Sequence, residues 1–245
     1  MNTLNTNKLL LAVFKDGENV LDGIEVEFGA IELSEGADLD EYQYYIHKVG
    51  FYLVHTVTWC RQLELAIEFL SNFDYSKKID ATRADHLIYN LENYFIRLNS
   101  VYDRVLQIVN AVFHLCISEE DVGHSVVVNN YKVQHRQQIK TAVKKVQKYL
   151  KDYSQTRHTL IHKHSYLDVK LKKIELFYMQ NIEEFSGSEV NKKRLKSFRS
   201  NYLRNFIAEK KEEFKNINNG LFLKLGELFD LLWEEYERLK KSLIK

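Results

Sequence analysis

Three histidines and an arginine lie close together in one short polar segment of the chain, residues 154–164. The titratable or cationic members of this segment are Arg157, His158, His162, Lys163 and His164. Histidine changes its charge near neutral pH, so it can give or take a proton under ordinary conditions. Arginine stays cationic and offers a planar fork of donors that matches a phosphate group. The segment therefore predicts acid–base chemistry beside a phosphate.

The spacing within the segment limits how these groups can meet. Arg157 and His162 are five residues apart, and on a straight α-helix five residues turn by about 140°. One regular helix therefore brings both side chains to the same phosphate poorly. We expect half of a site, completed by a kink, by a helix start, or by a second copy of the chain related by a two-fold axis.

Two other interpretations of the histidines stay open. His158, His162 and His164 are candidate zinc ligands, because histidine is the commonest metal ligand. Neither an HExxH motif nor a CxxC pair accompanies them, and Cys60 and Cys116 each lie in an apolar helical pattern typical of buried thiols. The histidines are otherwise structural or simply exposed. We expect no metal and no cofactor.

The composition indicates long helices in a soluble protein. The 245 residues include no proline and only nine glycines, so the strongest helix breaker is missing. Apolar residues make up 45% and charged residues 28%, an ordinary balance for a globular protein. No secretory signal is visible, and no uncharged run approaches the roughly 20 residues of a membrane span. We expect a cytoplasmic protein without membrane contact.

We expect an all-α, long-helix bundle over residues 37–245, preceded by a small extension over residues 1–36 with β-strand character. In the extension, the apolar run Leu9–Phe14 precedes the turn signal Asp16-Gly17, and Ile24–Phe28 alternates apolar and acidic residues. This pattern predicts a small β-hairpin. The expected helices cover about 38–73, 82–116, 131–153, 166–185, 188–216 and 221–243, with a stop at Asn218-Asn219-Gly220.

The helix expected over 82–116 has an apolar seam that recurs at steps of three and four residues. Its members are Leu87, Leu91, Tyr94, Leu98, Val101, Val105, Ile108, Val112 and Leu115. A seam that lasts four repeats is typical of packing inside a helical bundle.

The charges are divided unevenly along the chain. Residues 1–130 carry 9 Lys and Arg against 20 Asp and Glu, a net charge of −11, and residues 131–245 carry 26 against 14, a net charge of +12. This asymmetry predicts either packing between the two parts or contact of the basic part with an anion such as nucleic acid.

The helix expected over 131–153 concentrates the positive charge. Its seven cations have no acid among them before Asp152, and five of them follow at intervals of four, which makes a slowly turning stripe. Their mutual repulsion favours an anionic partner. We expect phosphate contacts from this stripe and from the end of the polar segment: Arg136, Lys140, Lys144, Lys148, Lys163 and His164.

A second basic segment, Lys192–Arg204, includes the aromatic residues Phe198 and Tyr202. Cations interleaved with aromatics are a mild signal for nucleic-acid binding. A surface helix that packs its aromatics inward explains the pattern equally well.

The run Arg157-His158-Thr159-Leu160-Ile161-His162 resembles the signature of the HEPN superfamily: an arginine, a polar residue, three or more variable residues and a histidine. In that family the polar residue is often Asn, Asp or His, and here it is His158. The preceding elements are similar too, with a long apolar helix that carries Tyr94–Arg97 and Tyr102–Arg104, a loop, and a basic helix leading into the motif. The resemblance covers about residues 40–180.

This resemblance implies a dimer of helical bundles, with both motifs lining one cleft, and metal-independent endoribonuclease activity. It further implies a role in toxin–antitoxin or antiviral defence, often beside a nucleotidyltransferase-like antitoxin protein. Some members of the family have lost catalysis and only bind nucleotides or RNA. We therefore expect a homodimeric ribonuclease with Arg157, His162 and His158 as catalytic residues. The alternative is a non-catalytic helical dimer that binds RNA or protein.

Overall fold

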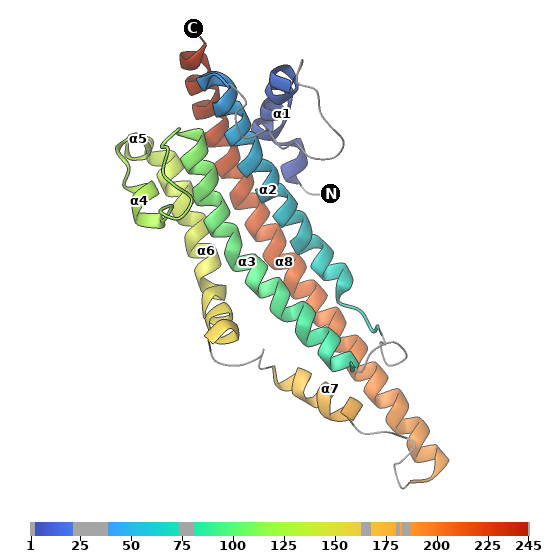
Figure 1. Ribbon diagram of the computed structural model, residues 1–245. Helices are drawn as coiled ribbons and strands as arrows, with labels where there is room; N and C mark the ends of the chain where they lie inside the picture. Colours follow the sequence, from blue (N-terminus) through green and yellow to red (C-terminus); the bar gives the residue numbers. More distant parts are fainter. Residues whose placement is uncertain are drawn as a thin grey trace. The chain divides into compact units, whose positions relative to one another are not determined.

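A computed structural model describes residues 3–21, 39–73, 81–162, 168–179, 182 and 187–244, with the side chains of residues 3, 21 and 155–162 left out. Every regular element in this part of the chain is a helix (Figure 1), which confirms the all-α prediction. None of the described helices combines the length and the apolar character that crossing a membrane requires. The elements are the 3₁₀ helix η1 (Thr3–Thr6) and the α-helices α1 (Lys8–Leu21), α2 (Glu41–Phe69), α3 (Arg83–Val112), α4 (His124–Val128), α5 (Tyr131–Gln134), α6 (Gln137–His162), α7 (Val169–Met179) and α8 (Glu189–Leu243).

The chain divides into two compact units, and the first comprises Met1–Cys60, Ser100–Tyr149 and Leu221–Lys245. Here the start of α2, the end of α3, the start of α6 and the end of α8 form a common core. Each large aliphatic side chain buried in it stabilises the unit by about 1.5–3 kcal/mol. The Tyr45 hydroxyl donates to the Val112 carbonyl at 2.9 Å. Fully buried core residues include Ile46, Leu53, Val105, Val109, Val143, Val146, Leu225 and Leu232.

The second unit comprises Arg61–Asn99 and Leu150–Gly220. The ring of Tyr94 on α3 stacks on Phe214 of α8, with centroids 3.5 Å apart. The Tyr94 hydroxyl donates to the Asn218 side chain at 3.0 Å, and Asn218 donates in turn to the Leu63 carbonyl of α2 at 3.1 Å. The Asn99 amide donates to the Tyr153 carbonyl at 3.3 Å, which attaches the last part of α6 to α3.

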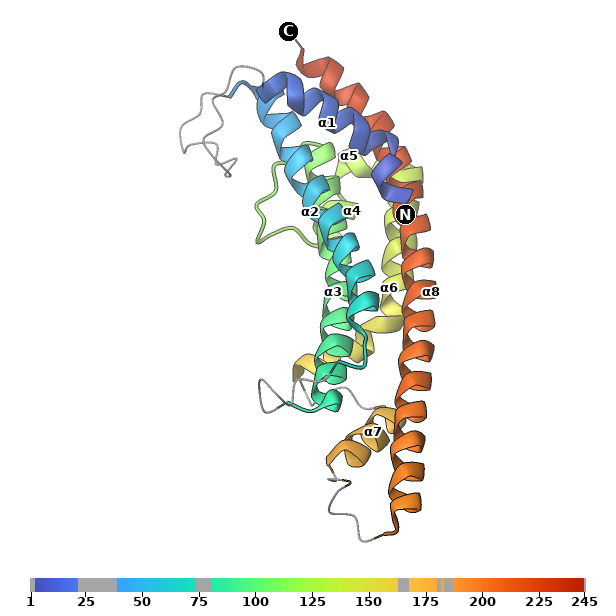
Figure 2. The same ribbon diagram turned by 90° about the vertical axis from the view of Figure 1, so that its right-hand side faces the viewer.

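The predicted β-hairpin near the N-terminus is wrong where the structure describes it. The apolar run Leu9–Phe14 and the turn signal Asp16-Gly17 both lie inside α1, and Ile24–Phe28 lies outside the described residues. The helix is stabilised by contacts remote in sequence. Tyr236 and Lys240 of α8 donate to the Asp16 carboxylate at 2.8 and 2.7 Å, and α1 runs beside the C-terminal part of α8 in Figure 2.

The apolar seam of α3 is confirmed from Leu87 to Val112, since all eight of these seam residues are buried. The helix ends at Val112 and not near Cys116, because His114 and Cys116 have positive φ angles of 47° and 56°. Asn110 stabilises this turn. Its amide donates to the Ile117 carbonyl at 2.9 Å, and its side-chain oxygen accepts from the Ile117 N–H at 3.2 Å.

The predicted stop at Asn218-Asn219-Gly220 is wrong, because α8 runs without a break from Glu189 to Leu243. Asn and Gly commonly end helices by taking left-handed or turn conformations. Here Asn218 is only 2% exposed. Its side chain accepts a hydrogen bond from the Tyr94 hydroxyl and donates one to the Leu63 carbonyl. This buried network holds residue 218 in the helix.

The basic helix expected over 131–153 has different ends in the structure. Residues Tyr131–Gln134 form the separate short helix α5, and α6 begins at Gln137 and continues to His162. The helix therefore continues through the polar segment as far as His162. It contains no Gly or Pro, and the Ser154 hydroxyl donates within the helix to the Lys151 carbonyl at 2.7 Å.

Candidate functional site

The motif residues Arg157, His158 and His162 lie on the last turns of α6, which is helical from Gln137 to His162. The motif is thus at the end of a helix, and the helix-start arrangement considered for it is wrong. In regular helical geometry the backbone positions of Arg157 and His162 are about 140° apart around the axis. Their side chains, and the whole of Lys163 and His164, lie outside the described part of the structure.

Three of the seven cations in residues 131–153 have partners within the first unit. Lys132 donates to the His114 carbonyl at the end of α3, at 3.1 Å. Arg136 and Lys145 pair with Glu235 and Glu227 of α8, at 2.9 and 3.3 Å. Both of these acids belong to the basic half of the chain. The cations of residues 131–245 therefore form ion pairs with acids of the same half of the chain, and not only with acids of residues 1–130.

The other four of these seven cations lie on α6 and make no ion pair with the described residues. They are Lys140, which is half-buried, and Lys144, Lys148 and Lys151, which are exposed. Three of these four are predicted phosphate contacts, and α6 presents them without neutralising acids. Arg136 differs from them, since part of its guanidinium is already engaged.

Lys144 lies near a hydrogen-bonded pair that links α3 to α4. The Tyr102 hydroxyl and His124 Nδ1 share a hydrogen bond. Burial lowers the pKa of His124, and the charge of Lys144 lowers it further, whereas burial raises the pKa of Tyr102. Both groups are therefore neutral at pH 7. They fix the short helix α4 beside the basic surface of α6.

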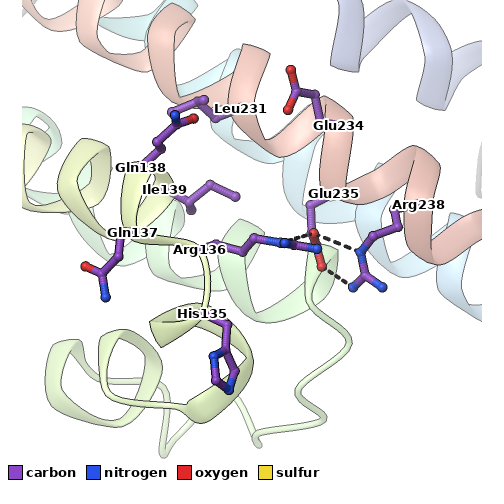
Figure 3. A pocket seen from close by; sticks show the side chains of 9 residues that line it. All are labelled: His135, Arg136, Gln137, Gln138, Ile139, Leu231, Glu234, Glu235 and Arg238. Carbon is purple, nitrogen blue, oxygen red and sulfur yellow. Dashed lines mark hydrogen bonds and ion pairs between the residues drawn. The ribbon is translucent and has the colours of Figure 1, made fainter.

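A buried carboxylate, Glu235, stands at the centre of a second polar cluster (Figure 3). Its side chain is 5% exposed and accepts from Arg136 Nε at 2.9 Å and from Arg238 Nε at 3.1 Å. Burial alone raises the pKa of Glu235, but hydrogen bonds from Arg238 and Arg136 and their charges outweigh it, so the pKa is lowered. Sequence analysis missed this cluster. The sequence holds no signal that distinguishes Glu235 from its exposed neighbour Glu234.

The same cluster borders a pocket of about 500 Å³ at the beginning of α6 (Figure 3). Its lining includes two arginines, Arg136 and Arg238, and two acids, Glu234 and Glu235, so the fixed charges of the lining balance. Such a balance gives no preference for a free anion. The pocket is lined by His135, Arg136, Gln137, Gln138, Ile139, Leu231, Glu234, Glu235 and Arg238.

Glu235→Gln is expected to reduce stability at pH 7 by about 1–3 kcal/mol, because it removes a charged acceptor from two arginines. Because the pKa of Glu235 is lower in the folded state, its ionised form stabilises the fold fully at pH values above the pKa of the unfolded state. This stabilisation is lost as the pH falls through the pKa of the folded state. The difference between wild type and variant should therefore shrink below about pH 4. Urea unfolding at pH 7 and at several acid pH values measures it.

Glu234→Gln is the matched control for this measurement, since Glu234 borders the same pocket but is exposed. Its unfolding free energy should stay within about 0.5 kcal/mol of wild type at every pH. An equal loss for Glu235→Gln at pH 7 and in acid would contradict the ionic role of Glu235.

Zinc ligation is the second interpretation of the motif histidines. Within the described side chains, no three His, Cys, Asp or Glu residues come together in a group able to hold a metal ion. The zinc alternative concerns His158, His162 and His164, whose side chains are not among those described.

Comparison with protein families gives a match over most of the chain. A family model described as Cthe2314-like HEPN matches residues 39–221, which includes α2, α3, α6 with the motif, and α7. No curated protein and no solved structure matches the chain.

Proposed function

Because the chain belongs to the HEPN superfamily, we propose that it is a metal-independent endoribonuclease that cleaves RNA through attack of the 2′-hydroxyl. The observation that carries this proposal is the set of residues that α6 holds. One continuous helix holds the complete arginine–histidine motif at its end and four cations without ion pairs to the described residues before it. This combination suits a phosphate-containing polymer as substrate.

The reaction needs two proton transfers and one stabilised anion. The 2′-oxygen attacks phosphorus, the bond from phosphorus to the 5′-oxygen breaks, and a 2′,3′-cyclic phosphate forms. His162 takes the proton from the 2′-hydroxyl or gives one to the leaving 5′-oxygen. His158 orients the phosphate or serves as the second acid–base group. Arg157 stabilises the negative charge that grows on the phosphorane-like transition state.

The proposed site is shared between two copies of the chain. Helical positions about 140° apart place Arg157 and His162 on different sides of α6. A two-fold dimer that apposes the ends of two α6 helices offers Arg157 of one subunit together with His162 of the other. Lys140, Lys144 and Lys148 then guide the RNA backbone along the helix, with Lys163 and His164 at the cleft. Arg136 contributes through the donors that Glu235 leaves unused.

A cytoplasmic toxin or an antiviral defence component is the cellular role that fits this activity. A ribonuclease without a metal requirement needs restraint when it is not in use. A nucleotidyltransferase-like antitoxin protein is the partner that family membership suggests for this purpose.

The experiment that tests the activity is cleavage of single-stranded RNA in the presence of EDTA. The wild-type protein is expected to cut the RNA at an unchanged rate after chelation, because histidine and arginine supply all of the chemistry. The products should carry 2′,3′-cyclic phosphate and 5′-hydroxyl ends, which end-group analysis identifies. RNA with 2′-O-methyl groups should remain intact, since it lacks the nucleophile.

Intact RNA after incubation with purified wild-type protein would overturn the nuclease proposal. Binding of RNA without cleavage would then favour the alternative, a non-catalytic helical dimer. Cleavage that EDTA abolishes would instead indicate a metal-dependent reaction.

A further inference from the structure

The N-terminal part of α8, in the second unit, carries a surface that is not used in the proposed cleavage. Residues 190–208 include six cations and no acid. Lys193, Arg194 and Arg204 are exposed, and no ion pair joins these three to the described residues. Glu189, just before this stretch, approaches Lys192 at 3.6 Å. The positive charge of Lys193, Arg194 and Arg204 faces solvent.

Helical geometry puts these three cations on one face of α8. With 100° per residue, Lys193, Arg194 and Arg204 fall within an arc of about 100°, and Ser197 and Asn201 lie between them. Leu203 and Phe206, which are buried, lie on the opposite side. The face is therefore a continuous polar surface with positive charge and small uncharged residues.

An aromatic ring borders this face. Phe198 is 55% exposed, and its ring contacts Phe177 of α7 edge-on with centroids 5.6 Å apart. It also lies beside Tyr202, at 6.2 Å. Helix α7 thus contacts the ring through Phe177, while more than half of the Phe198 surface stays exposed. A ring held in this way is suited to stack on a nucleic-acid base.

We propose that this face of α8 binds single-stranded RNA, with Lys193, Arg194 and Arg204 contacting the backbone phosphates and Phe198 stacking on a base. The choice of RNA as the nucleic acid rests on the proposed function. A basic face alone would also fit an acidic protein surface. The supported, half-exposed ring beside it favours a strand with accessible bases.

The test is binding of a fluorescent 2′-O-methyl oligouridine, measured by anisotropy over a range of salt concentrations. The probe lacks the nucleophile, so binding is read without cleavage. For a single strand, each phosphate contact contributes about −0.7 to the slope of log K against log salt. Replacing Lys193, Arg194 and Arg204 by Gln should reduce the slope by about 2 and weaken binding roughly 100-fold near 0.1 M salt.

Phe198→Leu should weaken binding by about 5- to 150-fold without changing the salt slope, because it removes stacking and no charge. The control removes three exposed lysines that lie within four residues of acids: Lys15→Gln, Lys215→Gln and Lys241→Gln. This control has the same net charge as the α8 variant and should keep the wild-type slope. Thermal melts of all the variants confirm that they fold.

The outcomes separate this inference from the nuclease proposal. A smaller slope of log K against log salt in the α8 variant supports RNA binding by this face, even if the wild-type protein does not cut natural RNA. If the α8 variant keeps the wild-type slope, the proposal that this face binds RNA is wrong, whether or not the protein is a nuclease. Failure of the wild type to bind the probe also overturns it. Displacement of the probe by polyglutamate at equal charge concentration would instead assign the face to an acidic protein.

Discussion

Replacing His162 by alanine is expected to lower the rate of RNA cleavage by about 10²- to 10⁴-fold, the usual contribution of one acid–base group. Arg157→Ala should cost about 10²- to 10³-fold, because it removes the donors that stabilise the transition state. Neither loss should be recovered by raising the RNA concentration, since both residues act on the chemical step. Single-turnover cleavage of a labelled RNA measures these rates.

Two further variants make the assignment specific. Arg157→Lys keeps the charge but loses the planar fork, so it should recover only part of the rate. His135→Ala removes an exposed histidine that forms no side-chain hydrogen bond or ion pair with the described residues, and it should cut RNA like wild type. If His162→Ala and His135→Ala were equally active, the motif would not be the catalytic centre.

The sequence carried strong information wherever the structure depends on local periodicity. The seam from Leu87 to Val112 recurs at helical steps, and each of its members is buried in α3. The lack of proline correctly indicated long helices. Burial of one apolar face is decided by neighbours three and four residues away, so a single sequence suffices to predict it.

Contacts between distant residues were beyond such reasoning. Asp16-Gly17 has the composition of a turn, but Tyr236 and Lys240, more than 200 residues later, hold Asp16 in a helix. Asn218 has the composition of a helix stop, but Tyr94 and Leu63 bind its side chain inside α8. In each case tertiary hydrogen bonds outweigh a local preference that is worth about 1 kcal/mol.

The same limit applies to the basic stripe of α6. Its spacing was visible in the sequence, but the partners of its members were not. Glu235 lies 99 residues after Arg136 and pairs with it, whereas Lys144 and Lys148 remain without ion pairs among the described residues. The structure thus separates a cation that stabilises the fold from cations that make no ion pair with the described residues.

A heterodimer of one Arg157→Ala subunit and one His162→Ala subunit is expected to regain about half of the wild-type activity, although each homodimer is nearly inactive. In a shared site, Arg157 of one subunit works with His162 of the other. The heterodimer then holds one site that lacks both groups and one that is intact. Co-expression with two different affinity tags, followed by sequential purification on both, yields the heterodimer free of homodimers.

The recovery discriminates between the two remaining ways of completing the site. If a bend within α6 brought Arg157 and His162 of the same chain to one phosphate, neither subunit of the heterodimer would hold both groups. Its activity would then stay as low as that of the homodimers, and the shared site would be wrong. Sedimentation of wild-type protein as a monomer at micromolar concentration would lead to the same conclusion. Recovery near one half requires that the two α6 ends meet across a two-fold axis, because only that arrangement pairs the intact residues of different chains.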